Sequence, residues 1–146
     1  MTDPGTQNLG NHVRWFPLFH FVALPVTLFY SLYQIALAVK DPTKASILYA
    51  VFTFAVACAV LGSRVMAVAV QDRVIRLEET LRMQRVLPAS MHGDIARVTR
   101  EQFVALRFAS DNELPELVRR VVAGEFPSQK SIKLAIKNWR GDFLRA

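Results

Sequence analysis

Two long apolar runs separated by a short charged turn constrain this chain more than any other feature of its sequence. Residues 16–39 carry no formal charge when His20 is neutral, and residues 45–70 contain one charged residue, Arg64. The turn between them, residues 40–44, is too short to hold structure of its own, so two helices joined by it run antiparallel. At a rise of about 1.5 Å per residue, each run is long enough to cross a hydrocarbon core of about 30 Å. The sequence therefore predicts a transmembrane hairpin.

The sequence as a whole predicts an all-α membrane protein in which this hairpin is followed by a soluble helical domain. A soluble pair of buried helices is the alternative, but the chain has too little soluble sequence to cover two runs that are apolar all round. The predicted organisation is a polar tail at 1–15, a hairpin at 16–70 with spans at about 16–39 and 46–70, a cytoplasmic extension of the second helix at 71–87, and a soluble helical domain at 88–146.

The predicted extension contains neither glycine nor proline, so the second helix is expected to continue to Pro88. Four apolar residues recur along it at spacings of four and three, namely Val70, Val74, Leu77 and Leu81. Two heptads are too few to indicate a coiled coil, so we interpret these residues as an ordinary amphipathic packing face.

Polar residues at capping positions predict three helices in the soluble domain. Two pairs have the spacing of a capping box and one serine can cap a last helix: Thr99 with Gln102, Ser110 with Glu113, and Ser128. Gly124 is expected to end the middle helix. The last helix is expected to carry Ile132, Ile136 and Trp139 and to end at Gly141.

Positive charge at the exit of the second run sets the expected orientation. Four arginines lie there, Arg73, Arg76, Arg82 and Arg85, whereas the turn between the runs has two lysines. Under the positive-inside rule the arginine-rich end stays in the cytoplasm, and two spans then place both termini on that side. We expect these arginines to contact lipid headgroups or a partner.

Three lysines of the last predicted helix, Lys130, Lys133 and Lys137, share one face. One interpretation is a basic amphipathic helix on anionic lipid or an acidic partner, with Trp139 as an interfacial anchor. The other is a bundle helix whose Trp139 packs inside and whose lysines are solvated. The second interpretation is favoured.

Polar residues inside the runs suggest contacts between the two helices. His20 and Arg64 lie equally far from Pro42 along the sequence, so antiparallel helices place them at one depth, where they could form a polar pair. The favoured alternative is that Arg64 reaches the headgroups while His20 lies in the interface. The same construction places Gln34 near Tyr49, where a hydrogen bond would fix the hairpin.

Small residues also form a stripe along the second run, at Ala55, Ala59, Gly62, Ser63 and Ala67. In lipid, helices associate by close approach of their backbones over such small residues. The stripe is therefore predicted to pack either the hairpin itself or a homo-oligomer.

Motifs that carry chemistry are missing from the sequence. The three histidines lie in separate segments without metal-ligand spacing, the lone Cys58 cannot form a disulfide within one chain, and neither a phosphate loop nor a nucleophile elbow is present. We therefore expect no enzyme activity, no metal and no cofactor. A membrane tether and a mild positive charge also make a nucleic-acid partner improbable.

Two classes of function remain. The first is a non-enzymatic, membrane-anchored interaction or scaffold protein that self-associates and docks a protein partner through its cytoplasmic helical domain. Its contacts are expected at Arg107, Phe108, Arg119 and Arg120. The second is an oligomeric channel or transport-related protein, with a pore lined by His20, Ser31, Gln34, Thr53 and Arg64.

Several motifs carry a resemblance to a known family. They are Gln7-Asn8, Asn11-His12, the run 14–20 (Arg-Trp-Phe-Pro-Leu-Phe-His), the run 82–88 (Arg-Met-Gln-Arg-Val-Leu-Pro), the run 105–115, Ile132-Lys133 and the run 136–139. With them the chain resembles, over almost its whole length, an uncharacterised family of small bacterial two-span membrane proteins. The resemblance implies a location in the bacterial inner membrane. It brings no reaction, ligand or catalytic residue.

Overall fold

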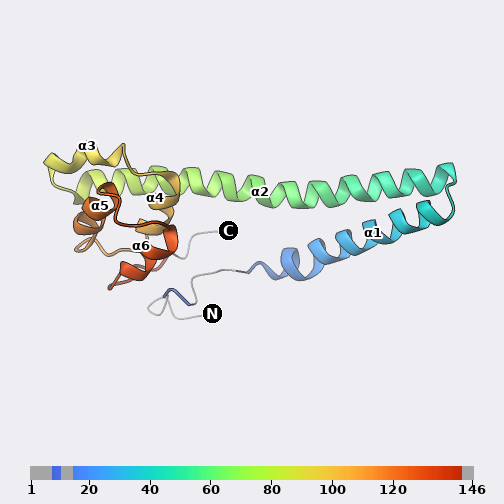
Figure 1. The fold of residues 1–146 in the computed structure, drawn as a ribbon, viewed down its shortest axis with the longest axis horizontal. Coiled ribbons are helices and arrows are strands. Elements are labelled where there is room, and N and C mark those ends of the chain that lie inside the picture. The colour runs from blue at the N-terminus through green and yellow to red at the C-terminus, as the bar shows by residue number, and fades with distance from the viewer. Residues whose placement is uncertain (1–7, 11–14, 143–146) are drawn as a thin grey trace. The chain divides into compact units, whose positions relative to one another are not determined.

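The structure, a computed structural model, describes residues 8–10 and 15–142, and every regular element among them is helical. Most of the predicted tail, residues 1–15, lies outside the described residues. The elements are the π-helix η2 (Leu18–Ala23), α1 (Leu24–Lys40), α2 (Lys44–Val86), the short 3-10 helix η3 (Ala89–Met91), α3 (His92–Ile95), α4 (Arg100–Leu106), α5 (Leu114–Val122) and α6 (Gln129–Ala135) (Figure 1). The predicted all-α class is confirmed.

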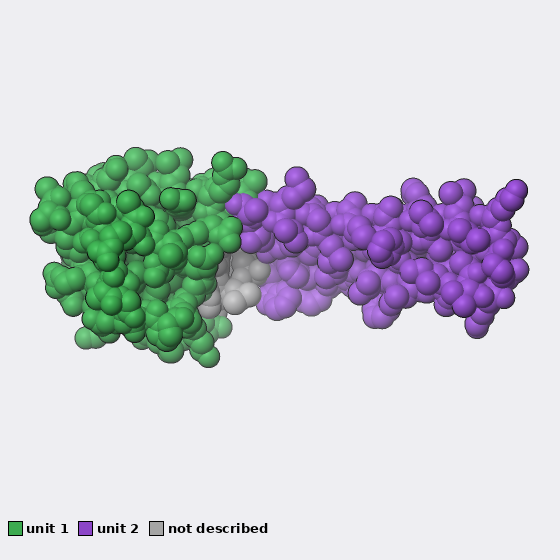
Figure 2. Space-filling view, turned by 45° about the horizontal axis from the view of Figure 1, so that its top comes forward, with its two compact units in different colours: residues 1–13, 70–145 green, residues 14–69, 146 purple. Residues whose placement is uncertain are grey.

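The chain divides into two compact units, which Figure 2 colours separately. The N-terminal unit consists mainly of residues 14–69 and the C-terminal unit mainly of residues 70–145. The long helix α2 is continuous and contributes to both. The C-terminal unit therefore includes residues 71–87, which the sequence assigned to a separate extension.

In the N-terminal unit, α1 runs back alongside the first half of α2 (Figure 1). The turn between them is closed by Ser46, whose Oγ donates to the Asp41 carbonyl at 2.6 Å and whose backbone N–H donates to Thr43 Oγ1 at 3.1 Å. These bonds satisfy backbone groups left free at the helix ends. Two helices, Leu18–Lys40 and Lys44–Val86, are long and apolar enough to cross a membrane.

A proline explains why the first of these helices changes its winding. Pro25 has no N–H to donate, and in an α-helix its ring would crowd the carbonyl four residues earlier. The wider π-helical turns of η2 end at Ala23, and the backbone N–H of Leu24 donates to the carbonyl of Phe19. The change of winding thus falls next to the proline, and the helix continues through it.

The buried residues of α1 and of the first half of α2 have small side chains. On α1, Ser31 is 2% exposed, and on α2 the buried residues are Ala50, Thr53 and Ala57, whose spacing of three and four places them on one face. Small side chains there let the two backbones approach closely. The predicted small-residue stripe lies on another face, since Ala55, Ala59, Ser63 and Ala67 are exposed and Gly62 is half-buried.

The C-terminal unit has a core of large apolar side chains. The end of α2 contributes Met83, α4 contributes Phe103 and Leu106, and α5 contributes Leu117 and Val118, all buried. The face of α2 that packs here also carries Ile75, Glu79 and Arg82. The packing face predicted from apolar spacing is therefore wrong: Val70, Val74, Leu77 and Leu81 are exposed. The buried face is the opposite one. It includes charged residues, which a search for apolar spacing cannot find.

Two of the predicted helix caps are confirmed and one is formed in part. Thr99 and Gln102 make a full capping box at the start of α4, and Ser128 caps α6. At Ser110 the backbone N–H donates to Glu113 Oε1 at 3.4 Å, while α5 begins at Leu114. Gly124 has φ +80° just after α5, the left-handed conformation in which glycine commonly ends helices.

The predicted last helix is too long. α6 ends at Ala135, and the following residues are extended and pair with the segment after α4: the N–H of Arg140 donates to the Phe108 carbonyl at 2.7 Å, and the N–H of Ser110 to the Asn138 carbonyl at 3.1 Å. The Glu113 carboxylate accepts from the N–H groups of Lys137 and Asn138 at 3.1 and 3.0 Å. These long-range bonds outweigh helix propensity beyond Ala135.

Candidate functional site

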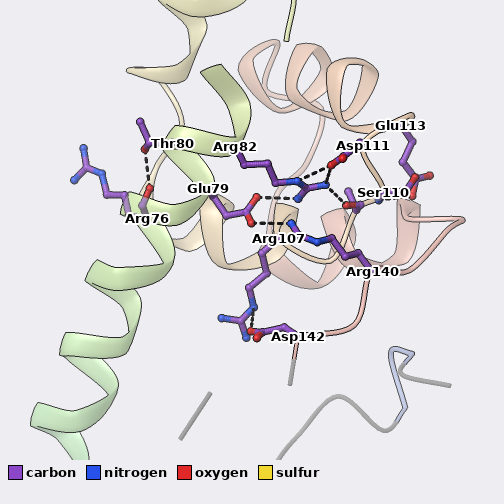
Figure 3. A network of polar contacts seen from close by, with 11 residues as sticks. Arg76, Glu79, Thr80, Arg82, Arg107, Ser110, Asp111, Glu113, Arg140 and Asp142 are labelled. Atoms are coloured by element: carbon purple, nitrogen blue, oxygen red, sulfur yellow. Dashed lines mark hydrogen bonds and ion pairs between the residues drawn. The ribbon is translucent and has the colours of Figure 1, made fainter. Parts of the chain in front are cut away.

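The most concentrated polar chemistry of the C-terminal unit surrounds Arg82, near the end of α2 (Figure 3). Its Nε donates to Asp111 Oδ1 at 2.7 Å, its Nη1 to Glu79 Oε2 at 2.9 Å and its Nη2 to the Ala109 carbonyl at 2.6 Å. The residue is 4% exposed, so two carboxylates balance a guanidinium that is nearly removed from water. Arg82 thereby ties α2 to the segment that follows α4.

Glu79 extends this network to the segment that follows α6. Its second carboxylate oxygen, Oε1, accepts from Arg140 Nη1 at 3.4 Å. Glu79 is buried like Arg82, whereas the Arg140 side chain is about half exposed. Because Arg140 also pairs through its backbone with Phe108, the network joins three separate stretches of chain.

A second ion pair lies beside the first network. Arg107 is buried, and its Nε lies 3.2 Å from Asp142 Oδ2. The Arg107 guanidinium lies 4.6 Å from the centre of the Phe108 ring, and Lys133 Nζ lies 5.4 Å from it. Two cations thus contact one buried ring, an arrangement stabilised by the ring quadrupole.

This arrangement holds segments of the C-terminal unit together. The Glu79 carboxylate is paired with the guanidinium groups of Arg82 and Arg140, and the Asp111 carboxylate with that of Arg82. A cavity of about 580 Å³ adjoins the network, with Leu81, Arg85 and Gly141 among its lining residues. Among the described residues, no three His, Cys, Asp or Glu side chains are grouped so that they could hold a metal ion. The network therefore acts as a lock within the C-terminal unit.

One titratable group outside the network has a shifted pKa. A hydrogen bond from its own backbone N–H, together with the neighbouring Arg100 guanidinium, lowers the pKa of the Glu101 carboxyl. Glu101 lies in the first turn of α4, where a negative charge also suits the helix dipole. The negative charge of Glu101 therefore favours the start of α4.

The four arginines predicted to contact lipid or a partner have different surroundings. Arg73, Arg76 and Arg85 are exposed on α2. Arg82 is buried in the network, so its predicted role as a surface contact is wrong. Its spacing of three residues from Glu79 brings it to a carboxylate on the same helix face, and that face turns into the core.

Two of the partner contacts expected in the C-terminal unit are also wrong. Phe108 is fully buried and Arg107 nearly so, because their segment pairs with the chain after α6. Arg119 is exposed and forms an ion pair with Glu116, and Arg120 is paired with Glu125 at 2.7 Å. The two arginines of α5 remain at the surface.

The basic face predicted for the last helix is not formed. Lys130 is exposed on α6, Lys133 is half-buried against Phe108, and Lys137 follows the end of the helix. Trp139 is half-buried, and its ring centre lies 5.0 Å from that of Phe108. The Trp packs against the core, as the second interpretation expected, but from an extended segment.

Two of the polar residues predicted to pair inside the N-terminal unit, His20 and Gln34, bond to residues four positions earlier in the sequence. His20 Nδ1 lies 2.9 Å from the Phe16 carbonyl, and Arg64 is half-buried. Among the described residues no hydrogen bond joins these two side chains. Gln34 Nε2 donates to Tyr30 Oη at 2.8 Å, so the partner expected at Tyr49 is replaced by a neighbour one turn away on α1.

Sequence reasoning missed the partners that complete the network, namely Glu79, Asp111, Glu113, Arg140 and Asp142. The pair Glu79 and Arg82 had a usable signal, since oppositely charged residues three apart can meet on a helix. The others come from separate segments, and no local pattern relates residue 79 to residue 140.

Fold and network together define an all-α protein with two helices of membrane-crossing length and apolarity and a compact helical unit locked by buried ion pairs. A family of unknown function, DUF6526, matches the chain over residues 1–146, and the chain belongs to that family. The resemblance to an uncharacterised family is thereby confirmed. Comparisons with curated proteins and with solved structures give no match.

Proposed function

We propose that this protein is a non-enzymatic, membrane-anchored interaction protein that self-associates and offers its helical unit to a protein partner. In this proposal α1 and the first half of α2 form a transmembrane hairpin in the bacterial inner membrane. The C-terminal unit and both termini lie in the cytoplasm, and Arg73, Arg76 and Arg85 give this part of α2 a positive charge that favours a membrane surface with anionic headgroups.

One observation carries the proposal: the N-terminal unit exposes nearly all of its large apolar side chains. Phe21, Phe29, Leu48 and Met66 are each exposed to about two thirds or more, together with many neighbours on both helices. Exposing apolar surface to water costs about 25 cal/mol for each Å², so continuous exposure over two helices of this length is unfavourable in water. Lipid removes this cost. Packing in lipid also commonly uses small side chains, such as those buried on α1 and α2.

The lock around Arg82 supports a scaffolding function. Within the C-terminal unit, the buried residues Glu79 and Arg82 on α2 form ion pairs with Arg140 and Asp111, which lie on two other stretches of chain. Such a unit suits the display of a surface to a partner. The competing proposal of a pore gains no support, since Ser31 and Thr53, two of its expected lining residues, are buried within the single chain.

Membrane fractionation tests the anchoring. Full-length protein expressed in bacteria should remain in the membrane pellet after washing with alkaline carbonate and should be released by mild detergent. Recovery in the supernatant without detergent would overturn the proposal. The control is a soluble cytoplasmic marker enzyme in the same lysate, which should leave the pellet completely.

A further inference from the structure

An apolar stripe on α2 is left uncovered by the C-terminal unit. Its four residues, Val70, Val74, Leu77 and Leu81, are between 47% and 62% exposed. The unit packs against other faces of the same helix, through Ile75, Glu79 and Met83. Large apolar side chains in regular spacing are thus presented outward by a helix that its own chain already holds in place.

The spacing of the stripe is that of a two-stranded coiled coil. With Val74 and Leu81 at the a positions, Val70 and Leu77 fall at the d positions, and the repeat averages about 3.5 residues. A β-branched residue at a and a leucine at d is the combination that favours parallel dimers. Val74 and Leu77 provide this combination at the centre of the stripe.

Charges beside the stripe identify the partner as a second copy. In this register Arg73 occupies a g position and Glu78 the e position five residues later, which is the pair that meets between parallel strands. Five residues on one helix place them about 140° apart, so they cannot pair within one chain. Both are exposed, and within the described part of the chain neither forms an ion pair or side-chain hydrogen bond. An antiparallel pairing would instead bring like charges together.

We propose that two copies of this chain associate through a short parallel coiled coil formed by Val70, Val74, Leu77 and Leu81, with Arg73 of each copy paired to Glu78 of the other. The inference rests on the proposed function, because anchoring in one membrane gives both helices the same direction. Confinement to a membrane also raises the effective concentration of the second copy, so two heptads suffice where free peptides would need more.

Disulfide cross-linking of full-length protein tests this pairing. Gln84 follows Leu77 by one heptad and is exposed, so the variant Cys58→Ser, Gln84→Cys places one thiol on the extended seam without removing an apolar contact. In vesicles of phosphatidylethanolamine and phosphatidylglycerol, mild oxidation should give a covalent dimer. The matched control, Cys58→Ser with Arg76→Cys, carries an exposed thiol off the seam and should give little dimer.

Charge exchange in the Gln84→Cys background tests the register. Arg73→Glu places like charges opposite each other twice in the dimer and should raise the apparent dissociation constant about tenfold. Adding Glu78→Arg should restore dimer formation, because the pair is then reversed and again attractive. Arg76→Glu, which changes the net charge as much as Arg73→Glu does, should leave the dimer unchanged.

The outcomes separate the inference from the proposed function. Flotation of the same vesicles reports whether the protein is inserted. Three results with inserted protein would overturn the coiled coil and leave the anchoring intact. They are the absence of a dimer, equal cross-linking through position 76, and failure of the double charge exchange to restore the dimer. Protein that fails to float with the vesicles would instead remove the proposed function.

Discussion

The two units bury opposite kinds of side chain. In the N-terminal unit the buried residues are small, as at Ser31 and Ala57, while large apolar residues are exposed. In the C-terminal unit large apolar residues such as Phe103 are buried together with charged ones such as Arg82. Both patterns of burial occur along one continuous helix, α2. This is the difference expected if the first unit lies in lipid and the second in water.

Truncating a phenylalanine should have very different effects on stability in the two units. Phe103, which is 1% exposed, lies in the C-terminal core, whereas Phe52 on α2 is 63% exposed. Phe103→Ala should lower the free energy of unfolding of the C-terminal unit by about 3–5 kcal/mol, because it leaves a cavity. Phe52→Ala should change it by less than about 0.5 kcal/mol. Denaturant unfolding in detergent micelles measures both, and equal effects would contradict the assigned cores.

Removing the central arginine should show that charge is part of the C-terminal core. Arg82→Ala leaves the buried Glu79 without its closest partner and should cost about 3 kcal/mol. Arg85→Ala, three residues along and exposed, is the matched control and should cost less than about 0.5 kcal/mol. The resistance of the C-terminal unit to protease digestion is measured for both variants. A loss no larger for Arg82→Ala than for the control would exclude the lock.

Enlarging a buried small residue should destabilise the N-terminal unit. Ala57→Leu inserts a large side chain between α1 and α2 and should destabilise their packing by about 1–3 kcal/mol. Ala59→Leu changes an exposed position of the same helix and should leave that packing intact. Resistance to unfolding in increasing sodium dodecyl sulfate compares the two variants. If Ala59→Leu proves the more disruptive, the inner face of α2 has been assigned incorrectly.

Local patterns in the sequence predicted much of the fold. Apolar length located both long helices, and the spacing of Thr99 with Gln102 and the position of Ser128 located helix starts, because these signals depend on residues a few positions apart. The extended chain after Ala135 was not predictable in this way, since it depends on Glu113 and Phe108 more than twenty residues earlier.

The candidate network was harder to predict than the fold. Apolar spacing selected Val74 and Leu77 as the packing face, while Glu79 and Arg82 pack there because each brings its own charge partner into the core. Arg82 also bonds to the Ala109 carbonyl and to Asp111, which lie twenty-seven and twenty-nine residues away in the sequence. The spacing of residues along the sequence does not predict contacts between such distant segments.

The most direct test of the account is the sidedness of two single cysteines in intact cells. In a Cys58→Ser background, Thr43→Cys lies in the turn between α1 and α2 and Ser90→Cys in the exposed η3 segment. A membrane-impermeant maleimide added to spheroplasts should label position 43 at once and position 90 only after lysis. Labelling of both positions from outside, or of neither until lysis, would contradict a hairpin that crosses the membrane with its helical unit in the cytoplasm.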